Sequence, residues 1–589
     1  MPRLTFQHPS FVVLMMLGVV LAYLIPYRYY PIPNFVPEAI ALLFAFAALV
    51  IRSVGDGFPR YFTLGWSVIA PLALAIWLVV AMPFTKTPYP DTVVFTLVSL
   101  LAAAAAASAG ASTASQQNSR NVVNIFSGFL IAASFLTFLL QIVQYFTPEF
   151  GTYWLLPLPA ASQPFGNFGQ RNHAACLHAL ALLSLVYRVG QHGQAYRLVW
   201  LALGLVALCG IVLSGSRSGS VTGAFAFILF ALMRRPHQPR GSYFRIASRT
   251  ALAVGLYVAL YLLIESALEI FPPTQAFDSA STRWMTYGNI PRQVLNELAM
   301  NIFLAHPLTG SGWGTFSAET LERVDGILLP QFANNSHNLL TQLAAEAGLI
   351  GVLVVIVPIA VVMIRSLKAP LTLERMYLLA FFGVFLAYSM TEFPLWHTFF
   401  LLPFAFALGL LDTAPRRIPI SMTLRVAVTV IWLGAAMATL NAAERFIHIT
   451  QMVKAVFHPG GQTPELRQYI AAHLNSPGFS PQTELLAFGL VAVDKENLPG
   501  KLALGARVIR QHIDSRLLSK YAALLALNGQ QEQAVNHLLI ACRFFPAGCA
   551  YIAQELAGAA RLDPDVFDPV LKAFKEQAPK DLLVITPPR

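Results

Sequence analysis

Thirteen apolar stretches follow one another along the first three quarters of the chain, separated for the most part by short polar loops. They lie near residues 10–27, 36–51, 62–83, 92–110, 122–146, 173–187, 198–214, 219–233, 250–268, 339–364, 374–390, 397–412 and 421–441. A helix that crosses the hydrocarbon core of a bilayer needs roughly 20 apolar residues, and it satisfies its backbone hydrogen bonds internally. The sequence therefore predicts an all-α, polytopic membrane protein with about thirteen spans.

The composition agrees with a membrane protein and argues against a soluble one. Hydrophobic residues make up 56% of the 589 residues and charged residues 11%, whereas soluble domains are about 45–50% apolar and about 25% charged. The net charge of +11 comes from basic residues in short loops, a pattern typical of membrane orientation and not of nucleic-acid binding. The first apolar stretch has no small-residue cleavage site, so we interpret it as a span and not as a removed signal peptide.

Lys and Arg are concentrated in alternate loops, which predicts the orientation of the chain. The loops after even-numbered stretches contain Arg52, Arg60, Arg120, Arg188, Arg197, Arg234, Arg235, Arg240, Arg245, Arg249, Arg365, Lys368, Arg416 and Arg417. The loops after odd-numbered stretches contain fewer, namely Arg28, Lys86, Arg171, Arg217, Arg283, Arg292 and Arg323. Because cationic loops remain in the cytoplasm, we expect the N-terminus inside and the C-terminal tail outside.

Two regions outside the predicted spans are long enough to carry function. The loop 270–338 is polar and rich in aromatic and amide residues, whereas most other loops are short connectors. The tail contains amphipathic runs that are typical of paired soluble helices. We therefore predict a transmembrane domain over residues 1–444, including the loop 270–338, and an outer α-helical domain over residues 445–589.

The four cysteines give no evidence of a metal site. Cys176 and Cys209 lie in predicted spans and fit there as small core residues. Cys542 and Cys549 flank a predicted turn in the tail, where their spacing permits a disulfide on an oxidising side, although nothing else in the sequence requires one. No pair has zinc-ligand spacing together with histidines, so we predict neither a metal nor a cofactor.

His337 is the candidate catalytic base. It lies in the run NNSHNLLTQLAAEAGLIG that begins at residue 334, where a polar cluster directly precedes an apolar helix. Asn335 or Ser336 can cap that helix and place His337 in its first turn at the membrane surface. An imidazole near a helix N-terminus is disfavoured as a cation and is available as a base at neutral pH. The alternative is an ordinary interfacial histidine.

Arginines in two outer loops suit a diphosphate. Arg283 and Arg292 belong to a segment that we expect to form an amphipathic helix ending in a Gly-rich turn, which contains Trp313. Arg217 lies in LSGSRSGS between two apolar stretches, flanked by small residues that let a bulky anion approach the backbone. Guanidinium groups form bidentate bonds with phosphate oxygens, although solvated loop arginines or snorkelling to headgroups are the alternatives.

Further polar residues stand at the outer ends of predicted spans. Gln170, Arg171 and Asn172 belong to QPFGNFGQRNHAA, and Glu392 and His397 belong to TEFPLWHTFF. They are candidates for binding a headgroup or a sugar, while helix capping and an interfacial aromatic belt are the simpler alternatives. All of these segments fall on the same predicted face, although only Lys and Arg were used to predict the orientation.

At these residues the chain resembles the O-antigen ligase and O-oligosaccharyltransferase superfamily, especially the bacterial protein O-oligosaccharyltransferases that glycosylate pilins and other exported proteins. The resemblance rests on the order and spacing of FGNFGQRNHAA, SGSRSG, Arg283-Trp284 followed by HPLTGSGWGTF, SHNLLTQLAAEAGLIG and EFPLWHTFFLLPF. It extends from about residue 163 to about residue 405, and the soluble tail also matches that branch.

The resemblance implies a metal-independent transferase of the bacterial inner membrane that acts on the periplasmic side. It would move a glycan en bloc from undecaprenyl diphosphate to Ser or Thr hydroxyls of pilin-like exported proteins. In that family, the residue matching His337 activates the acceptor hydroxyl, those matching Arg217 and Arg283 hold the donor diphosphate, and a glutamine matching Gln170 lies near donor or acceptor. The branch often has tyrosine in the turn EFPLWH, whereas this sequence has Phe393 and His397, so no role that needs a phenol is carried over.

Two other functions remain open at this point. An O-antigen ligase or polysaccharide polymerase would use the same chemistry with a sugar acceptor, but the tail favours a protein acceptor. A transporter of lipid-linked sugar would bury ionisable residues in the middle of its spans, and the predicted spans have almost none. A glycosidase would need paired acidic residues, which we do not find on the outer face.

Overall fold

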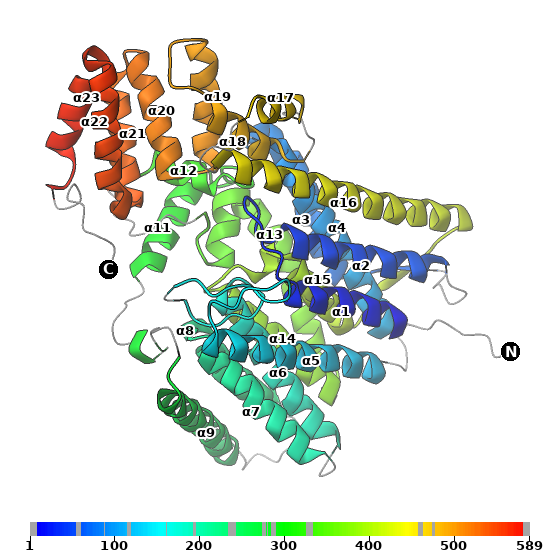
Figure 1. Cartoon of the computed structure of the whole chain (residues 1–589). Helices are drawn as coiled ribbons and strands as arrows, with labels where there is room; N and C mark the ends of the chain where they lie inside the picture. The colour runs from blue at the N-terminus through cyan, green and yellow to red at the C-terminus, as the bar shows by residue number, and fades with distance from the viewer. Residues whose placement is uncertain are drawn as a thin grey trace. The chain divides into compact units, whose positions relative to one another are not determined.

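The computed structural model describes residues 9–54, 61–87, 89–114, 119–160, 162–192, 196–233, 243–273, 279, 281–283, 290–324, 334–457, 463–473 and 478–580. Within these ranges the chain is helical almost throughout, with one pair of short strands (Figure 1). The predicted all-α class is therefore confirmed. Trp284 and the basic residues Arg60, Arg234, Arg235 and Arg240 lie outside the described residues.

Each of the thirteen predicted apolar stretches corresponds to one helix over most of its length. These helices are α1 (Pro9–Leu24), α2 (Phe35–Val54), α3 (Trp66–Ala81), α4 (Pro90–Ala114), α5 (Ser119–Phe146), α6 (Arg171–His192), α7 (Arg197–Leu213), α8 (Arg217–Met233), α9 (Tyr243–Ile270), α13 (Leu339–Lys368), α14 (Leu373–Ser389), α15 (Thr398–Leu411) and α16 (Met422–Phe457). Among the described residues, 8 helices are long and apolar enough to cross a membrane, and α1, α7 and α15 are shorter apolar helices. The exact number of spans stays a prediction.

The remaining helices belong to the long loop and the tail. They are α11 (Ile290–Ala305), α12 (Phe316–Glu322), α17 (Pro464–His473), α18 (Ser480–Leu490), α19 (Leu498–Gln511), α20 (Ser515–Leu527), α21 (Gln531–Phe544), α22 (Cys549–Leu562) and α23 (Pro564–Gln577). Short 3-10 turns are η1 (Met82–Phe84), η3 (Pro394–Trp396) and η4 (Pro546–Gly548).

The chain divides into two compact units, each built from separate segments. The first unit contains Met1–Ile76, Leu97–Gly288 and Leu353–Glu444, and the second contains Trp77–Thr96, Asn289–Val352 and Arg445–Arg589. The predicted boundary between residues 444 and 445 coincides with one of these divisions, although α16 continues across it. The tail thus shares a unit with part of the long loop.

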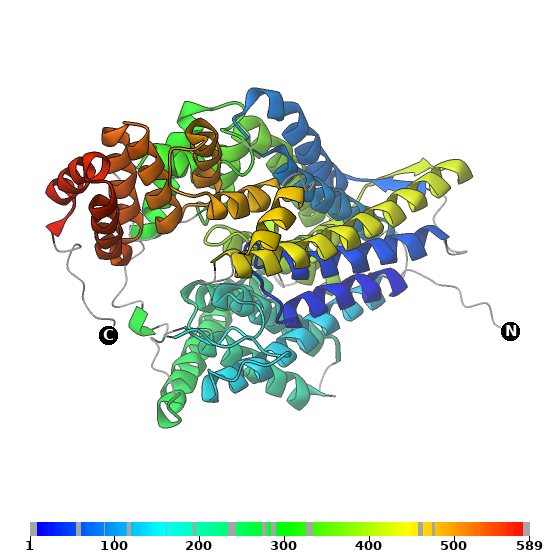
Figure 2. The same ribbon diagram turned by 45° about the horizontal axis from the view of Figure 1, so that its top comes forward.

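In the first unit, helices pack through small residues as well as aromatic ones. Helices α1 and α2 lie side by side, and α6 packs against α5, α7 and α8 (Figures 1 and 2). Helices α4 and α15 cross at Gly110 and Gly409, where an added Cβ would lie 2.2 Å from the Phe406 carbonyl oxygen and 2.1 Å from that of Ala107, respectively. Close backbone contact through small residues is the usual way in which spans associate without a hydrophobic driving force.

Two strands join loops that are far apart in the sequence. The strand β1 (Tyr61–Leu64) pairs antiparallel with β2 (Arg416–Pro419). The predicted apolar stretch 62–83 was therefore wrong at its start, because the β1 backbone hydrogen-bonds to a distant strand and the helix begins only at Trp66. Pairing requires both loops on one side of a membrane, which agrees with the even number of spans predicted between them.

The second unit has its own core and a disulfide. Helices α20 and α21 pack against each other, as do α22 and α23 (Figure 1). Cys542 at the end of α21 is joined to Cys549 at the start of α22 across η4. The sequence left this disulfide open, and the structure contains it. The tail core also includes Leu298 of α11 and Phe316 of α12.

The crossing of α4 and α15 generates a test of the first unit. We expect Gly409→Val to lower the melting temperature of the detergent-solubilised protein by several degrees, because overpacking a tight contact costs about 1–3 kcal/mol. Gly434→Val is the matched control, since an added Cβ on that α16 glycine meets nothing within 4 Å. Equal melting temperatures for the two variants would contradict the close crossing.

His512 in the tail makes stability depend on pH. Burial lowers the pKa of His512 to about 4, although a hydrogen bond to the backbone of Pro481 opposes the shift. An unfolded histidine has a pKa of about 6.5, so below that value the unfolded chain binds a proton that the folded chain does not. Stability contributed by neutral His512 is thus complete above about pH 6.5 and is lost as the pH falls toward 4.

We therefore expect the melting temperature of the wild type to fall by roughly 3 °C more than that of His512→Gln between about pH 6.5 and pH 5. Glutamine retains a hydrogen-bond donor but does not titrate in this range. Parallel melting curves for the two proteins, recorded by differential scanning fluorimetry, would show that His512 does not carry this dependence.

Candidate functional site

The predicted site residues fall in both units of the chain. Those in the first unit are Gln170, Arg171, Asn172, Arg217, Arg283, Glu392 and His397, and those in the second are Arg292, Trp313 and His337. We describe each group within its own unit. Within the described ranges, no three His, Cys, Asp or Glu side chains gather as they would around a metal ion.

In the first unit, a buried carboxylate organises the segment before α6. Glu392 is 0% exposed and accepts hydrogen bonds from Asn172 Nδ2 at 2.6 Å and from Gln170 Nε2 at 3.4 Å. The Asn172 Oδ1 atom in turn accepts from Ser216 Oγ at 2.8 Å. Three predicted segments are thus brought together around the buried Glu392 carboxylate.

The turn before α8 fixes Arg217. The Ser216 Oγ atom accepts from Gly219 N at 3.0 Å and so caps the helix that begins at Arg217. Gly215 has a φ of 54°, which favours glycine at this position. Asn172 and Ser216 therefore connect the buried Glu392 to the first residue of α8.

Arg217 and Arg283 are held by each other's backbone segments. Arg217 Nη1 donates to the carbonyl oxygen of Arg283 at 3.4 Å, and Arg283 Nη1 donates to that of Gly215 at 3.3 Å. Both side chains are partly exposed. A carbonyl acceptor orients a guanidinium without removing its charge, and the N-terminus of α8 adds positive potential. This arrangement brings two cations together as an anion site requires.

Three residues between α1 and the first turn of α2 were not predicted as part of the site. Arg28 Nη1 donates to Asn34 Oδ1 at 2.7 Å, and Glu38 accepts from His397 Nδ1 at 2.9 Å and from Thr398 N at 2.5 Å. Burial lowers the pKa of Arg28 to about 10, opposed by the charge of Glu38, so Arg28 remains a cation at neutral pH. The sequence feature that could have identified Glu38 is the presence of an acidic residue at the start of an apolar stretch.

His397 and Arg171 also have protein partners. His397 is buried and pairs with Glu38, so it anchors the turn after α14. Arg171 donates to the buried Gln163 from the first residue of α6 and remains partly exposed. Gln170 and Asn172 are partly exposed beside it. Of the predicted substrate-binding residues in this unit, Gln170, Arg171 and Asn172 are accessible, whereas His397 and Glu392 are not.

In the second unit, His337 has a strained backbone. Its φ is 54°, in the left-handed region that a non-glycine residue adopts only where its surroundings enforce it. The Asn335 side chain accepts from His337 N at 3.1 Å, and Ser336 Oγ donates to the carbonyl oxygen of Asn338 at 3.1 Å. The imidazole remains partly exposed. Strain of this kind is typical of functional turns.

The predicted cap of the following helix was wrong. The side chain of Asn338, and not that of Asn335 or Ser336, accepts from the backbone N–H of Leu340 at 3.0 Å. Because α13 begins at Leu339, His337 precedes the helix and does not belong to its first turn. The reason is that Asn335 and Ser336 bond within the turn itself.

Helix α11 supports the same turn. Thr341 Oγ1 donates to Asn296 Oδ1 at 2.8 Å, and Asn296 Nδ2 donates to the carbonyl oxygen of Arg292 at 2.7 Å. Thr341 Oγ1 also lies 2.9 Å from Ser336 Oγ. Arg292 is partly exposed, one turn before Asn296 on α11. The structure thus brings Arg292 into the surroundings of the His337 turn.

The glycines of the turn after α11 permit close packing and need no ligand to explain them. An added Cβ at Gly310, where φ is 71°, would lie 2.3 Å from the carbonyl carbon of Glu346 on α13. At Gly348, where α13 departs from helical geometry, it would lie 2.2 Å from the carbonyl oxygen of Leu308. Trp313 Nε1 donates to Thr96 Oγ1 at 2.9 Å and the ring remains partly exposed.

Three family models match successive parts of the chain. One for a protein glycosylation ligase matches residues 164–189, one for an O-antigen ligase matches 202–356, and one for the C-terminal part of a virulence factor membrane-bound polymerase matches 376–556. The matched ranges contain every predicted site residue.

A similar protein is a general O-oligosaccharyltransferase of Acinetobacter baylyi (strain ATCC 33305 / BD413 / ADP1). It is 25% identical over 304 residues, which cover 50% of this chain and 52% of that protein, so the match spans about half the length of this relative. The resemblance drawn from the sequence motifs is confirmed, because the chain is similar to O-antigen ligases, to a membrane-bound polymerase family and to an O-oligosaccharyltransferase.

Proposed function

We propose that this protein is a glycosyltransferase that moves a glycan en bloc from undecaprenyl diphosphate to Ser or Thr hydroxyls of exported, pilin-like proteins. The reaction takes place on the periplasmic side of the bacterial inner membrane. The observation that supports the proposal most is that Arg217 donates to the backbone of Arg283 while Arg283 donates to the backbone of Gly215. These bonds join two cations that lie in sequence motifs 66 residues apart and that we assign to the donor diphosphate. The matches to a protein glycosylation ligase and to an O-oligosaccharyltransferase support it.

The two guanidinium groups bind the donor and stabilise its leaving group. As the bond between the anomeric carbon and the phosphate oxygen breaks, negative charge grows on the diphosphate. Arg217 and Arg283 offset that charge through charge-assisted hydrogen bonds, and their fixed positions avoid reorganisation during the reaction. Undecaprenyl diphosphate leaves with the electron pair of the broken bond.

His337 accepts the proton of the acceptor hydroxyl. The hydroxyl oxygen forms its bond to the anomeric carbon as the proton moves to the imidazole, which makes the oxygen a sufficient nucleophile at neutral pH. The strained turn keeps the ring in one position, and a pre-oriented base avoids an entropic cost in the transition state. Residues Gln170, Arg171, Asn172, Arg292 and Trp313 are the accessible groups that we assign to substrate binding.

A sugar acceptor is the second candidate function. The models named for an O-antigen ligase and for a membrane-bound polymerase cover more residues than the one named for protein glycosylation. Reconstitution with the lipid-linked glycan and either a Ser-rich pilin-like protein or a lipid A core distinguishes the two. Product on the protein alone supports our proposal, and product on the lipid A core alone supports the alternative.

Replacing His337 tests the base. We expect His337→Gly to lower the turnover number by at least about 100-fold, because general base catalysis contributes about 10²–10⁴. Glycine accepts a φ of 54° without strain, so the variant should melt no lower than the wild type. His306→Gln, in the same loop, is the matched control and should retain activity. Undiminished transfer by His337→Gly would refute the assignment.

Arg217→Lys and Arg283→Lys test the donor site. Lysine preserves the charge but not the bidentate geometry, so we expect each variant to raise KM for the lipid diphosphate about tenfold and to lower the turnover number. KM for the acceptor should change little. Arg120→Lys is the control, since Arg120 is largely exposed and pairs with Glu374. A donor KM equal to that of the wild type in both variants would argue against a diphosphate site.

A further inference from the structure

Two polar side chains are buried on α13 beneath the His337 turn. Gln342 is 3% exposed and Glu346 is 4% exposed, and they lie one helical turn apart. Burying an amide or a carboxylate is costly unless its hydrogen bonds are satisfied. Both side chains are satisfied, and apart from the bond between them their partners lie on segments outside α13.

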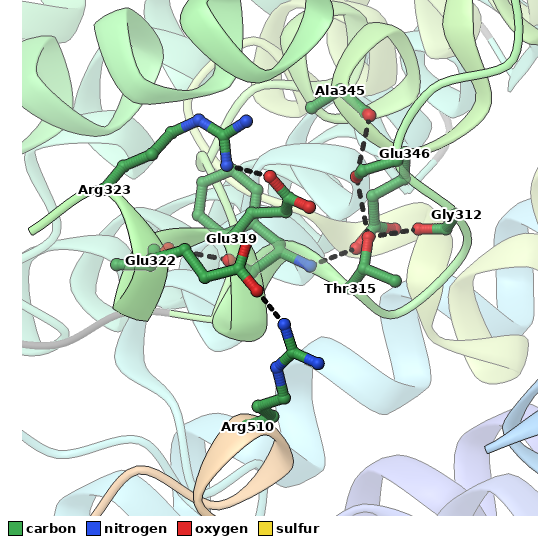
Figure 3. Close-up of polar contacts among 11 residues, drawn as sticks. Gly312, Thr315, Glu319, Glu322, Arg323, Ala345, Glu346 and Arg510 are labelled. Atoms are coloured by element: carbon green, nitrogen blue, oxygen red, sulfur yellow. Dashed lines mark hydrogen bonds and ion pairs between the residues drawn. The ribbon is translucent and has the colours of Figure 1, made fainter. Parts of the chain in front are cut away.

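Together, the hydrogen bonds of these residues form a continuous chain. Gln342 Oε1 accepts from the backbone N–H of Ser336 at 2.7 Å, directly before His337. Gln342 also hydrogen-bonds to the Glu346 side chain, which accepts from the backbone N–H groups of Gly314 and Phe316. The distance from Phe316 N to Glu346 Oε1 is 3.2 Å. Figure 3 shows Glu346 directed toward the turn that contains Gly312 and Thr315.

The Ser336 end fixes the direction of these hydrogen bonds. A backbone N–H can only donate, so the Gln342 amide is oriented with Oε1 toward Ser336. Its Nε2 group, which can only donate, therefore faces Glu346. A flipped amide would bring two acceptors together at one end and two donors together at the other.

We propose that Gln342 and Glu346 act as a positioning relay for His337. The relay is the hydrogen-bonded chain from the Gly314–Phe316 backbone through Glu346 and Gln342 to Ser336. This proposal deepens the proposed function and rests on it. It assigns to neither residue any contact with substrate. The relay fixes the position of the His337 turn relative to the start of α12. A displacement of this turn by about 1 Å would make transfer far slower.

The far end of the relay is held by the tail. Glu322, on α12, pairs with Arg510 of α19 (Figure 3). Arg543 of α21 donates to the carbonyl oxygen of Val324 at 3.4 Å, just after α12. The tail helices thus brace the segment from which the relay starts, and the relay transmits that position to the base.

Exchanging the two residues is the sharpest test. In Glu346→Gln, the new amide can keep its backbone N–H partners only by turning its NH2 group toward the NH2 group of Gln342. One of the two amides must then flip, which disturbs the hydrogen bond at Ser336. In Gln342→Glu, two carboxylates are buried one turn apart and repel each other. In the double variant Gln342→Glu and Glu346→Gln, every hydrogen bond of the relay can form again. The backbone N–H groups still donate at both ends, and donor and acceptor are exchanged only in the bond between the two side chains.

We expect each single variant to lower the turnover number by about 10- to 100-fold while KM for the donor changes by less than about twofold. The double variant should return to within about threefold of the wild type. The melting temperature of each full-length variant is measured alongside the turnover number. Thr341→Val is the comparison, because it removes a different, partly buried hydrogen bond of the same turn and has no partner exchange that could restore it.

Three results would overturn the relay. These are unchanged turnover in the single variants, no recovery in the double variant, and losses that follow the melting temperature alone in all variants. If even the wild type transfers no glycan, the proposed function fails. The relay is then tested separately by modifying His337 with diethyl pyrocarbonate. The rate of modification of His337, followed by mass spectrometry, should change at least about threefold in each single variant and return in the double variant. A rate that does not return overturns the relay.

Discussion

A peptide group that is removed from water needs another hydrogen-bond partner, and this requirement shapes the loops of the protein. Buried carboxylates and amides meet it by bonding to the backbone of neighbouring loops. The side chains that do so are Gln144, Asn167, Gln342 and Glu346. The few polar residues at the ends of the apolar helices therefore determine the conformation of the segments that carry the candidate site. A chain so poor in charge concentrates its chemistry in these segments.

The candidate catalytic groups depend on such support in different ways. Arg217 and Arg283 are held by backbone carbonyls, which orient the guanidinium groups. His337 keeps a left-handed conformation because its neighbours bond to one another around it. In each case, residues that do not react hold the reactive group in position. Glu392 and Gln342 are examples, buried next to accessible neighbours.

Much of the fold was predictable because helix formation in a membrane follows local hydropathy. Each of the thirteen apolar stretches corresponds to a helix, and the motifs indicated the families whose models match the chain. Partners separated by hundreds of residues were not predictable. The pairing of β1 with β2 and the contact of His397 with Glu38 depend on how distant segments meet, which no local pattern records. The cap at Asn338 was missed because Asn335, Ser336 and Asn338 can all cap the same helix.

The most direct test of the account is the stoichiometry of a single reaction mixture. Purified protein is incubated with a glycan linked to undecaprenyl diphosphate and with a Ser-rich exported protein, and two quantities are measured together. These are the undecaprenyl diphosphate released and the increase in intact mass of the acceptor. The account predicts equal molar amounts, with each acceptor gaining the mass of one whole glycan. Release of the lipid without any gain in acceptor mass would contradict transfer to protein.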